Sequence, residues 1–256
     1  MYGWRGRIGL MVPTGNSVME PEFHRLCPEG VSVHANRIRL DAVTPASLSG
    51  MDADAVRAAQ GLVSIRLGVL AFGCTSGSFV GGKGHDAGLI SRIERATGVL
   101  ATTTSTAVLR ALRTLGVRRI ALATPYTDEV NAIEVRFLED HGFQVTRALG
   151  GGLTGVADIQ ECEPHVAYRR AREVDDDRAE AVFISCTGLR TIEVLAPLEA
   201  DLGKPVISAN QATFADCLRI LGVGEAPLGF GSLFARVLEA DAARVTGSTA
   251  PTSLSA

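Results

Sequence analysis

The chain has 256 residues, 46% of them hydrophobic, which is enough for a sizeable core in one compact domain or in two half-size ones. Its 25 Lys and Arg residues nearly balance its 28 Asp and Glu residues, and the formal net charge is −3. Proteins that hold nucleic acid through bulk positive charge need a basic excess. The composition excludes that class, and we expect no nucleic-acid partner.

The sequence also gives no sign of membrane insertion or export. Its longest uncharged run, 67–82, is shorter than the roughly 18 apolar residues of a membrane span and contains three hydroxyl residues. Residues 1–7 lack the apolar core and cleavage site of a secretory signal. We therefore expect a cytoplasmic protein with no membrane partner. Disulfides are rare in that compartment, and the five cysteines show no CxxC spacing, so neither a disulfide framework nor a zinc site is indicated.

Short apolar runs bounded by Gly, Pro, Ser or Thr alternate along the chain with segments of helical period. The runs predicted as strands are 7–12, 67–72, 119–123, 181–185 and 205–208. Continuous apolar runs are typical of strands buried on both faces of a parallel sheet. The segments predicted as helices are 105–115, 127–141 with Thr127 as its N-cap, 191–202 and 211–221. This alternation predicts an α/β fold in which helices cover parallel sheets.

One short pattern occurs twice, almost half a chain apart. The dipeptides Cys74-Thr75 and Cys186-Thr187 each follow an apolar strand and precede a predicted helix. We expect equivalent strand ends from two similar half-chains to face each other across a cleft. Ligands of open α/β sheets bind at the carboxyl ends of the strands, so the cleft is the predicted site.

These two cysteines are the predicted reactive groups. A cysteine at the start of a helix is close to backbone N–H groups and to the positive end of the helix dipole, and both lower its pKa from about 8.5. Cys74 and Cys186 are therefore expected to ionise readily. Cys27, Cys162 and Cys217 lack this context, so we interpret them as core residues.

The residues that follow each cysteine are small and can bring backbone amides and hydroxyls close to a ligand. Thr75 and Ser76 follow the first cysteine, and Thr187 and Gly188 follow the second. Such loops bind anions and match a carboxylate well.

Two further polar residues follow predicted strands at the same edge. Asn16 comes after the first strand and Tyr126 after the strand 119–123. Each is a candidate hydrogen-bond donor to a substrate carboxylate, and each has an alternative role as a turn or cap residue. His85 is the best-placed histidine for a Cys–His pair, although a surface role is the competing interpretation.

Other kinds of site find little support. The glycine-rich segments 81–84 and 150–152 lack the context of a phosphate-binding loop or a dinucleotide fingerprint. The acidic run 175–177 lacks the spacing of a calcium loop. We therefore expect no metal and no cofactor.

Five segments together resemble a known superfamily. They are 73–76 (GCTS), 105–109 (STAVL), 115–119 (LGVRR), 123–126 (ATPY) and 185–189 (SCTGL). They are similar to the aspartate/glutamate racemase superfamily, in the branch of the maleate cis-trans isomerases and arylmalonate decarboxylases. The resemblance runs from about residue 5 to residue 235.

This resemblance implies two pseudo-symmetric lobes, each a four-stranded parallel sheet flanked by helices, with the active site in the cleft between them and no metal or organic cofactor. We expect 1–112 with 210–256 to form the first lobe and 113–209 the second. The last residues, 247–256, show no apolar periodicity and are expected to be a disordered tail.

The resemblance also assigns roles to residues. The carboxylate-holding pocket of the decarboxylases carries over to Thr75, Ser76 and Tyr126, with backbone amides around Cys186 and Thr187. Those enzymes have a single cysteine, which matches Cys186, and a glycine at the position of the first one. Two cysteines, with an Asn in the segment 13–17, resemble the maleate isomerases instead.

Two other positions separate this chain from its possible relatives. Segment 155–160 lacks the further Asn that the isomerases carry. Glutamate racemases usually follow their second cysteine with Thr-His, whereas this chain has Thr187-Gly188.

The leading hypothesis is a cofactor-independent cis-trans isomerase of a small dicarboxylate such as maleate, with Cys74 as nucleophile and Cys186 as acid. The alternatives are a decarboxylase of malonate-type acids, a racemase of a carboxylic acid in the same two-cysteine pocket, and a non-catalytic protein that binds a small acid. In every case the expected partner is a small dicarboxylic or carboxylic acid, and a homo-oligomer is possible.

Overall fold

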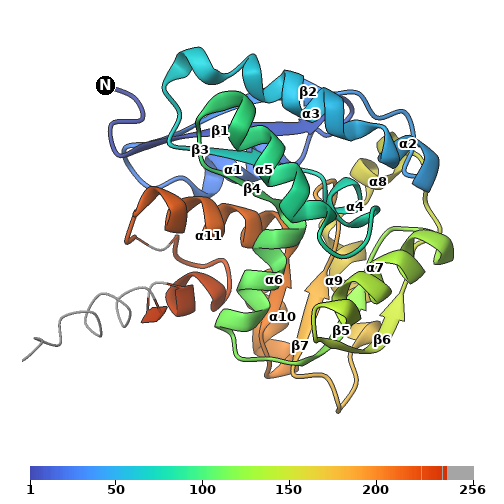
Figure 1. The fold of residues 1–256 in the computed structure, drawn as a ribbon. Coiled ribbons are helices and arrows are strands. Elements are labelled where there is room, and N and C mark those ends of the chain that lie inside the picture. The colour runs from blue at the N-terminus through green and yellow to red at the C-terminus, as the bar shows by residue number, and fades with distance from the viewer. Residues whose placement is uncertain (226, 238, 241–256) are drawn as a thin grey trace, which may run out of the picture.

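The computed structural model describes residues 1–225, 227–237 and 239–240, and within them the strands form two four-stranded parallel sheets. In the first sheet the order is β2 (Val31–Ile38), β1 (Gly6–Pro13), β3 (Val69–Phe72) and β4 (Ala101–Thr103). In the second sheet the order is β6 (Gln144–Leu149), β5 (Arg119–Ala123), β7 (Ala181–Ile184) and β8 (Val206–Ser208). The two sheets repeat one strand order, and they lie side by side in the molecule (Figure 1).

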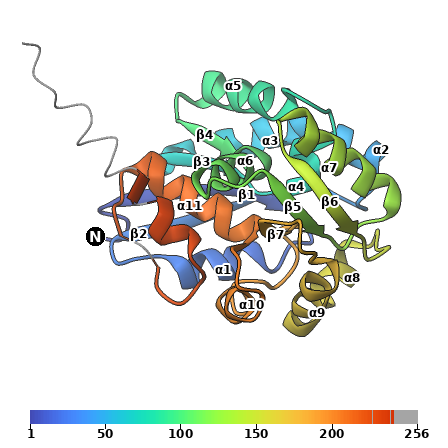
Figure 2. The same cartoon turned by 90° about the horizontal axis from the view of Figure 1, so that it is seen from below.

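Helices cover both faces of each sheet. They are α1 (Met19–Leu26), α2 (Pro45–Ser49), α3 (Met51–Gln60), α4 (Thr75–Phe79), α5 (His85–Thr97), α6 (Thr104–Thr114), α7 (Asp128–Asp140), α8 (Val156–Glu161), α9 (Pro164–Val174), α10 (Leu195–Leu202) and α11 (Ala209–Leu221). Figure 2 shows α3 and α5 on one face of the first sheet and α1 on the other, and α7 opposite α9 and α10 around the second. This is the predicted α/β fold with parallel sheets and flanking helices.

The sequence located the central strands better than the edge strands. Each predicted strand overlaps an observed one, and β3 and β7 are buried along their whole length, as continuous apolar runs require. β2 and β6 were missed because they lie at sheet edges and are partly exposed, so their sequences carry no apolar run. β4 was missed because it has only three residues, two of them Thr.

One detail of the helix prediction is wrong, and the predicted N-cap is confirmed only in its position. The helix expected over 191–202 begins only at Leu195, because the amides of Thr191 and Ile192 donate to the carboxylate of Glu22. Thr127 does precede α7, but its side chain makes no capping hydrogen bond.

β1–β4 form one sheet and β5–β8 the other, and the proposed bounds of the two lobes stay a prediction. α11 packs against α6, β3 and β4, and it also contacts β8 of the second sheet. Its assignment to the first lobe stays a prediction, and the expected tail 247–256 lies outside the described residues. Among the residues that the structure describes, no helix has the length and apolar character needed to cross a membrane.

Candidate active site

The carboxyl ends of β1, β3, β5 and β7 meet around one small cavity of about 30 Å³. A volume of this order holds very few water-sized molecules, so the cavity is narrow. All eight residues predicted for the site line it, and they are Asn16, Cys74, Thr75, Ser76, Tyr126, Cys186, Thr187 and Gly188. The tertiary fold therefore brings together side chains that lie up to 172 positions apart in the sequence.

Cys74 lies where β3 ends and occupies the N-cap of α4. Its sulfur accepts a hydrogen bond from the Gly77 amide at 3.4 Å and lies 3.8 Å from Ser76 Oγ. The residue is 3% exposed. Burial raises the pKa of the thiol, while the contacts with Gly77 and Ser76 lower it.

Cys186 follows the end of β7, and its backbone has a φ of 101°, a conformation rarely adopted by residues other than glycine. Its sulfur accepts a hydrogen bond from the Gly188 amide at 3.4 Å, and the hydroxyl of Tyr126 is within hydrogen-bonding reach. Burial raises the pKa of this thiol to about 12. Backbone strain of this kind is common at functional sites, where the surrounding structure holds one side chain in place.

The expectation that the two cysteines ionise readily is wrong for this structure. Loss of solvation outweighs the backbone N–H groups, because both thiols are buried and no cationic residue lines the cavity among the described residues. α4 has only five residues, so it contributes a short helix dipole. Both cysteines therefore hold their protons at neutral pH.

Asn16 joins the two halves of the site. Its Nδ2 donates to Thr187 Oγ1 at 3.1 Å, and the Thr187 hydroxyl donates to the carbonyl of Gly73, also at 3.1 Å. Asn16 Oδ1 accepts hydrogen bonds from the backbone amides of Val18 and Met19. The turn role weighed for Asn16 is thus present, together with a contact between the lobes that the sequence did not predict.

A buried carboxylate extends this connection and was missed by the sequence analysis. Glu22 of α1 accepts hydrogen bonds from the Thr191 amide at 2.6 Å and from Asn210 Nδ2 at 2.7 Å. Asn210 Nδ2 also lies 3.2 Å from the carbonyl of Thr187. A signal for Glu22 did exist: it shares the buried stripe of α1 with Met19, Phe23 and Leu26, where a charge needs a partner.

Thr75 Oγ1 is buried and has no hydrogen-bond partner among the described residues. A buried hydroxyl without a partner is costly, so this atom is suited to bind a ligand.

Tyr126 is 1% exposed and packs edge-on against Phe79, with ring centroids 6.3 Å apart. Burial and the charges of Cys186 and Glu134 raise its pKa well above the usual value, so it is a neutral donor.

The cavity also has an aliphatic wall. It consists of Pro13, Leu40, Val43, Val156 and Ile159. Segments from both lobes meet here, because the amide of Val43 donates to the carbonyl of Thr154 at 2.9 Å.

Gln160 of α8 also links the lobes at this wall. Its Oε1 accepts from the amide and the hydroxyl of Ser17 at 2.7 and 2.6 Å, and its Nε2 donates to the carbonyl of Val156. Its amide is therefore already engaged within the protein.

The remaining candidates lie elsewhere. His85 Nε2 is 3.2 Å from the carbonyl of Gly77 and 3.4 Å from Asp52, and His85 does not line the cavity, so no Cys–His pair is formed. Cys217 is fully buried, and Cys27 and Cys162 are partly buried against the core. Within the described part of the chain, no three His, Cys, Asp or Glu side chains gather as a metal site.

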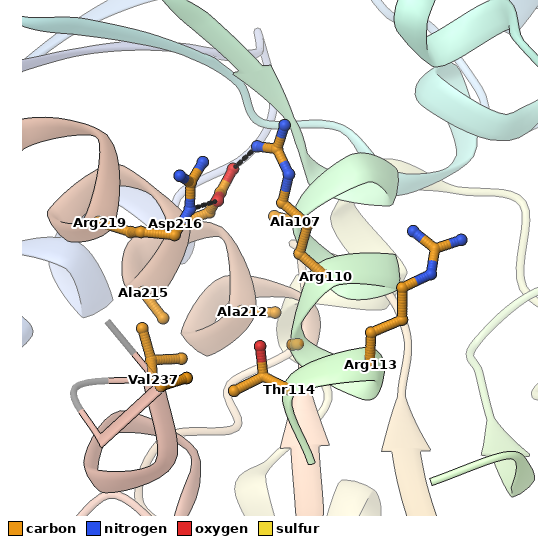
Figure 3. A pocket seen from close by; sticks show the side chains of 11 residues that line it. Ala107, Arg110, Arg113, Thr114, Ala212, Ala215, Asp216, Arg219 and Val237 are labelled. Carbon is orange, nitrogen blue, oxygen red and sulfur yellow. Dashed lines mark hydrogen bonds and ion pairs between the residues drawn. The ribbon is translucent and has the colours of Figure 1, made fainter. Parts of the chain in front are cut away.

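A larger pocket of about 560 Å³ lies between α6 and α11 (Figure 3). Its floor is formed by alanines of the two helices, and the Asp216 carboxylate at its rim is paired with Arg110 and Arg219, both at 2.8 Å or less. None of its described lining residues is a cysteine or histidine. The candidate chemistry therefore belongs to the small cavity.

Comparisons with known proteins give the family of this chain. The family model for arylmalonate decarboxylase matches residues 8–234. Arylmalonate decarboxylase of Bordetella bronchiseptica is 35% identical over 231 residues, which cover 89% of this chain and 95% of that protein. Maleate isomerase of Nocardia farcinica is 32% identical over 242 residues, 89% of this chain and 94% of the isomerase.

A solved structure has the same fold. It is a cysteine-to-serine mutant of the Nocardia farcinica maleate cis-trans isomerase with a covalently bound succinylcysteine intermediate, and it superposes with a TM-score of 0.85 at 25% identity over 90% of this chain and 98% of its own. The chain therefore belongs to the arylmalonate decarboxylase family of enzymes, in the maleate isomerase and decarboxylase branch of the aspartate/glutamate racemase superfamily.

Proposed function

We propose that this protein is a cofactor-independent cis-trans isomerase of a small dicarboxylic acid of the maleate type, with Cys74 as nucleophile and Cys186 as acid. One observation carries the proposal: two thiols, from equivalent strand ends of the two sheets, line the same cavity. Two thiols in one site allow one to bond to carbon while the other transfers a proton.

The lining also offers two places for carboxylates. Thr75 and Ser76 follow Cys74, and Thr187 and Gly188 follow Cys186, so each thiol has its own loop of small polar residues. Thr75 Oγ1 has no hydrogen-bond partner in the described part of the chain. A cis-dicarboxylate carries its two carboxylates close together, and the narrow cavity favours such a compact acid.

In the proposed reaction Cys74 passes its proton to a carboxylate of the bound acid, and the resulting thiolate adds to one alkene carbon, forming a C–S bond. The electron pair of the double bond moves toward the carboxylate on the other alkene carbon, and the Cys186 thiol then protonates that carbon. Rotation about the new single bond precedes the reverse steps, in which Cys186 takes back a proton and the C–S bond breaks to give the trans acid. The succinylcysteine bound by the Nocardia enzyme is the product that such an addition gives.

The two thiols suit these roles for different reasons, which concern how each one holds or loses its proton. A pKa of about 12 keeps the proton on Cys186 until the adjacent carbon becomes basic. Cys74 must lose its proton before it attacks, and the Gly77 amide and Ser76 hydroxyl are the groups that favour its thiolate. Tyr126 is a neutral donor beside them, suited to charge that develops on the carboxylate.

A second candidate is decarboxylation of a malonate-type acid, or racemisation of a carboxylic acid. The aliphatic wall favours it, because no cationic residue among the described lining would pair with a carboxylate placed there. An apolar substituent, or a carboxylate about to leave as CO₂, suits such a wall better than a bound anion. Loss of CO₂ leaves an enediolate that Cys186 protonates from one face, and Cys74 on the other face would permit racemisation.

The test is proton NMR in D₂O with maleate, aryl-malonates, aspartate, glutamate, hydantoins and a 2-aryl carboxylate. We expect fumarate to form from maleate with wild-type protein. Cys74→Ala and Cys186→Ala should each abolish turnover, whereas Cys162→Ala, which changes a cysteine away from the cavity, should not. Loss of CO₂ or exchange of the α-proton, without fumarate, would establish the second candidate. A Cys74→Ala protein with the wild-type rate would refute the scheme.

A further inference from the structure

Glu134 is a buried carboxyl that the proposed reaction does not use. It lies on α7 and is 1% exposed. Its Oε1 accepts a hydrogen bond from Ser185 Oγ at 2.6 Å, and its Oε2 has no partner among the described residues. An ionised carboxylate buried without a cation is costly, so this group favours its protonated form.

The carboxyl lies directly behind the thiol site. Its partner Ser185 precedes Cys186 in the chain, and the Ser185 amide donates to the carbonyl of Ala123 at the end of β5. A negative charge on Glu134 raises the pKa of both Cys186 and Tyr126. Glu134 thus contacts the residue that begins the strained turn at Cys186.

Few other charges face this region. α7 packs against α4 and β6. α4 brings Cys74 at its N-cap, whereas Arg147 of β6 is exposed and donates to the carbonyl of Glu173. From α9, Arg170 donates to the carbonyl of Thr124 rather than to Glu134. The titratable neighbours of Glu134 are therefore Cys186, Tyr126 and, beyond them, Cys74, none of which supplies a positive charge.

We propose that Glu134 is a positioning residue of the thiol site: its protonated carboxyl holds Ser185 and the turn that carries Cys186, and its ionisation places an unpaired negative charge behind Cys186 and Tyr126. Any effect on turnover rests on the proposed function, but the ionisation and its effect on Cys186 do not. Burial raises the pKa of Glu134 to about 8, so the change falls just above neutral pH. Above that pH, Cys186 becomes harder to ionise and the site binds an anion less well.

The first test follows the carboxyl itself. Carbon-13 NMR of protein labelled at the glutamate side-chain carboxyl should show one resonance with a midpoint near pH 8, and Glu134→Gln should remove that resonance. If every glutamate of the wild-type protein titrates in the ordinary range, the proposal is wrong.

The second test measures Cys186 without any substrate. Alkylation by iodoacetamide is followed by mass spectrometry of the tryptic peptide 179–190, which contains no other cysteine. We expect Glu134→Gln to match wild type at pH 7 and to react at least about threefold faster at pH 9, because the facing charge is gone. Glu129→Gln, an exposed position on the same helix, is the matched control and should match wild type at both pH values.

A purely structural role for Glu134 would give a different pattern. Loosening of the turn would speed alkylation equally at both pH values, and that result, or no change at either, overturns the proposal. If an acid of the panel is converted, kcat/KM of wild type should fall between pH 7 and pH 9 and should fall less in Glu134→Gln. If no acid of the panel is converted, the proposed function fails, while the NMR and alkylation measurements still decide the role of Glu134.

Discussion

The side-chain amide of Asn16 donates a hydrogen bond of 3.1 Å to the hydroxyl of Thr187, although the two residues lie 171 positions apart. The first follows β1 of one sheet, and the second follows β7 of the other. This contact holds the loop that carries Cys186 against the lobe that carries Cys74. The relative position of Cys74 and Cys186 therefore depends on polar contacts between the lobes as well as on the apolar core.

Removing this contact should affect both stability and activity. Asn16→Ala leaves the amides of Val18 and Met19 without partners and removes the donor to Thr187 Oγ1, so we expect the unfolding free energy to fall by about 1–3 kcal/mol in urea titrations. The kcat/KM should fall as well, because the Cys186 loop is less well placed. Asn16→Asp keeps the acceptor for the two amides and should lose less stability. Wild-type stability in Asn16→Asp, which lacks the donor to Thr187, would show that the link to Thr187 is unimportant.

Two threonines of the cavity should respond in opposite ways to the same change. Thr75→Val removes a hydroxyl that has no protein partner, so stability should hold while KM for the acid rises, by about tenfold. Thr187→Val removes a hydroxyl bonded to Asn16 and Gly73 and should cost about 1–3 kcal/mol of stability. Urea unfolding and steady-state kinetics on both variants check this. A Thr75→Val protein with unchanged KM would exclude the hydroxyl from substrate binding.

The backbone at Cys186 predicts an unusual order of stabilities. At a φ of 101° a residue with a side chain is strained, whereas glycine is not. We expect Cys186→Gly to be more stable than Cys186→Ala by about 1 kcal/mol in thermal unfolding, despite the greater flexibility of glycine in the unfolded chain. The opposite order would mean that the turn relaxes when the sulfur is removed.

Glu22 should not tolerate the loss of a carboxylate oxygen. Its two oxygens accept from Thr191, Ile192 and Asn210, and a glutamine amide cannot accept on its nitrogen side. Glu22→Gln should therefore lower unfolding free energy by about 1–3 kcal/mol near neutral pH. Unchanged stability in urea titrations would show that Glu22 does not stabilise the contact between α1 and the second lobe.

The same substitution at Glu134 should have the opposite effect, and only at higher pH. The folded-state pKa of about 8 lies above the ordinary value of 4.5, so the folded protein binds the extra proton in this window and its stability falls as pH rises from 4.5 to 8. Below 4.5 the carboxyl is protonated in both states and imposes no such cost. Glu134→Gln should match wild type at pH 4 and exceed it at pH 9 by on the order of 4 kcal/mol in urea unfolding. A constant difference across this range would contradict the raised pKa.

Much of the fold could be predicted from local sequence patterns. Continuous apolar runs marked β1, β3, β5, β7 and β8, because a strand buried on both faces must be apolar throughout. The repeated Cys-Thr pattern indicated the two strand ends that meet at the site. Edge strands such as β2 and β6 are partly exposed, so local hydrophobicity did not reveal them.

The sequence by itself determined the two thiols and the polar loop residues of the cavity, since residues after the central strands of parallel sheets meet at one edge whatever the details of packing. Only the tertiary structure decided their chemical state. Burial reversed the expected direction of the pKa shift at Cys74 and Cys186. The packing of distant helices brought Glu134 into contact with Ser185, and Glu22 and Asn210 into contact with each other next to the site. Solvation and contacts between the lobes depend on the packing of the whole chain, and for that reason no local pattern could predict them.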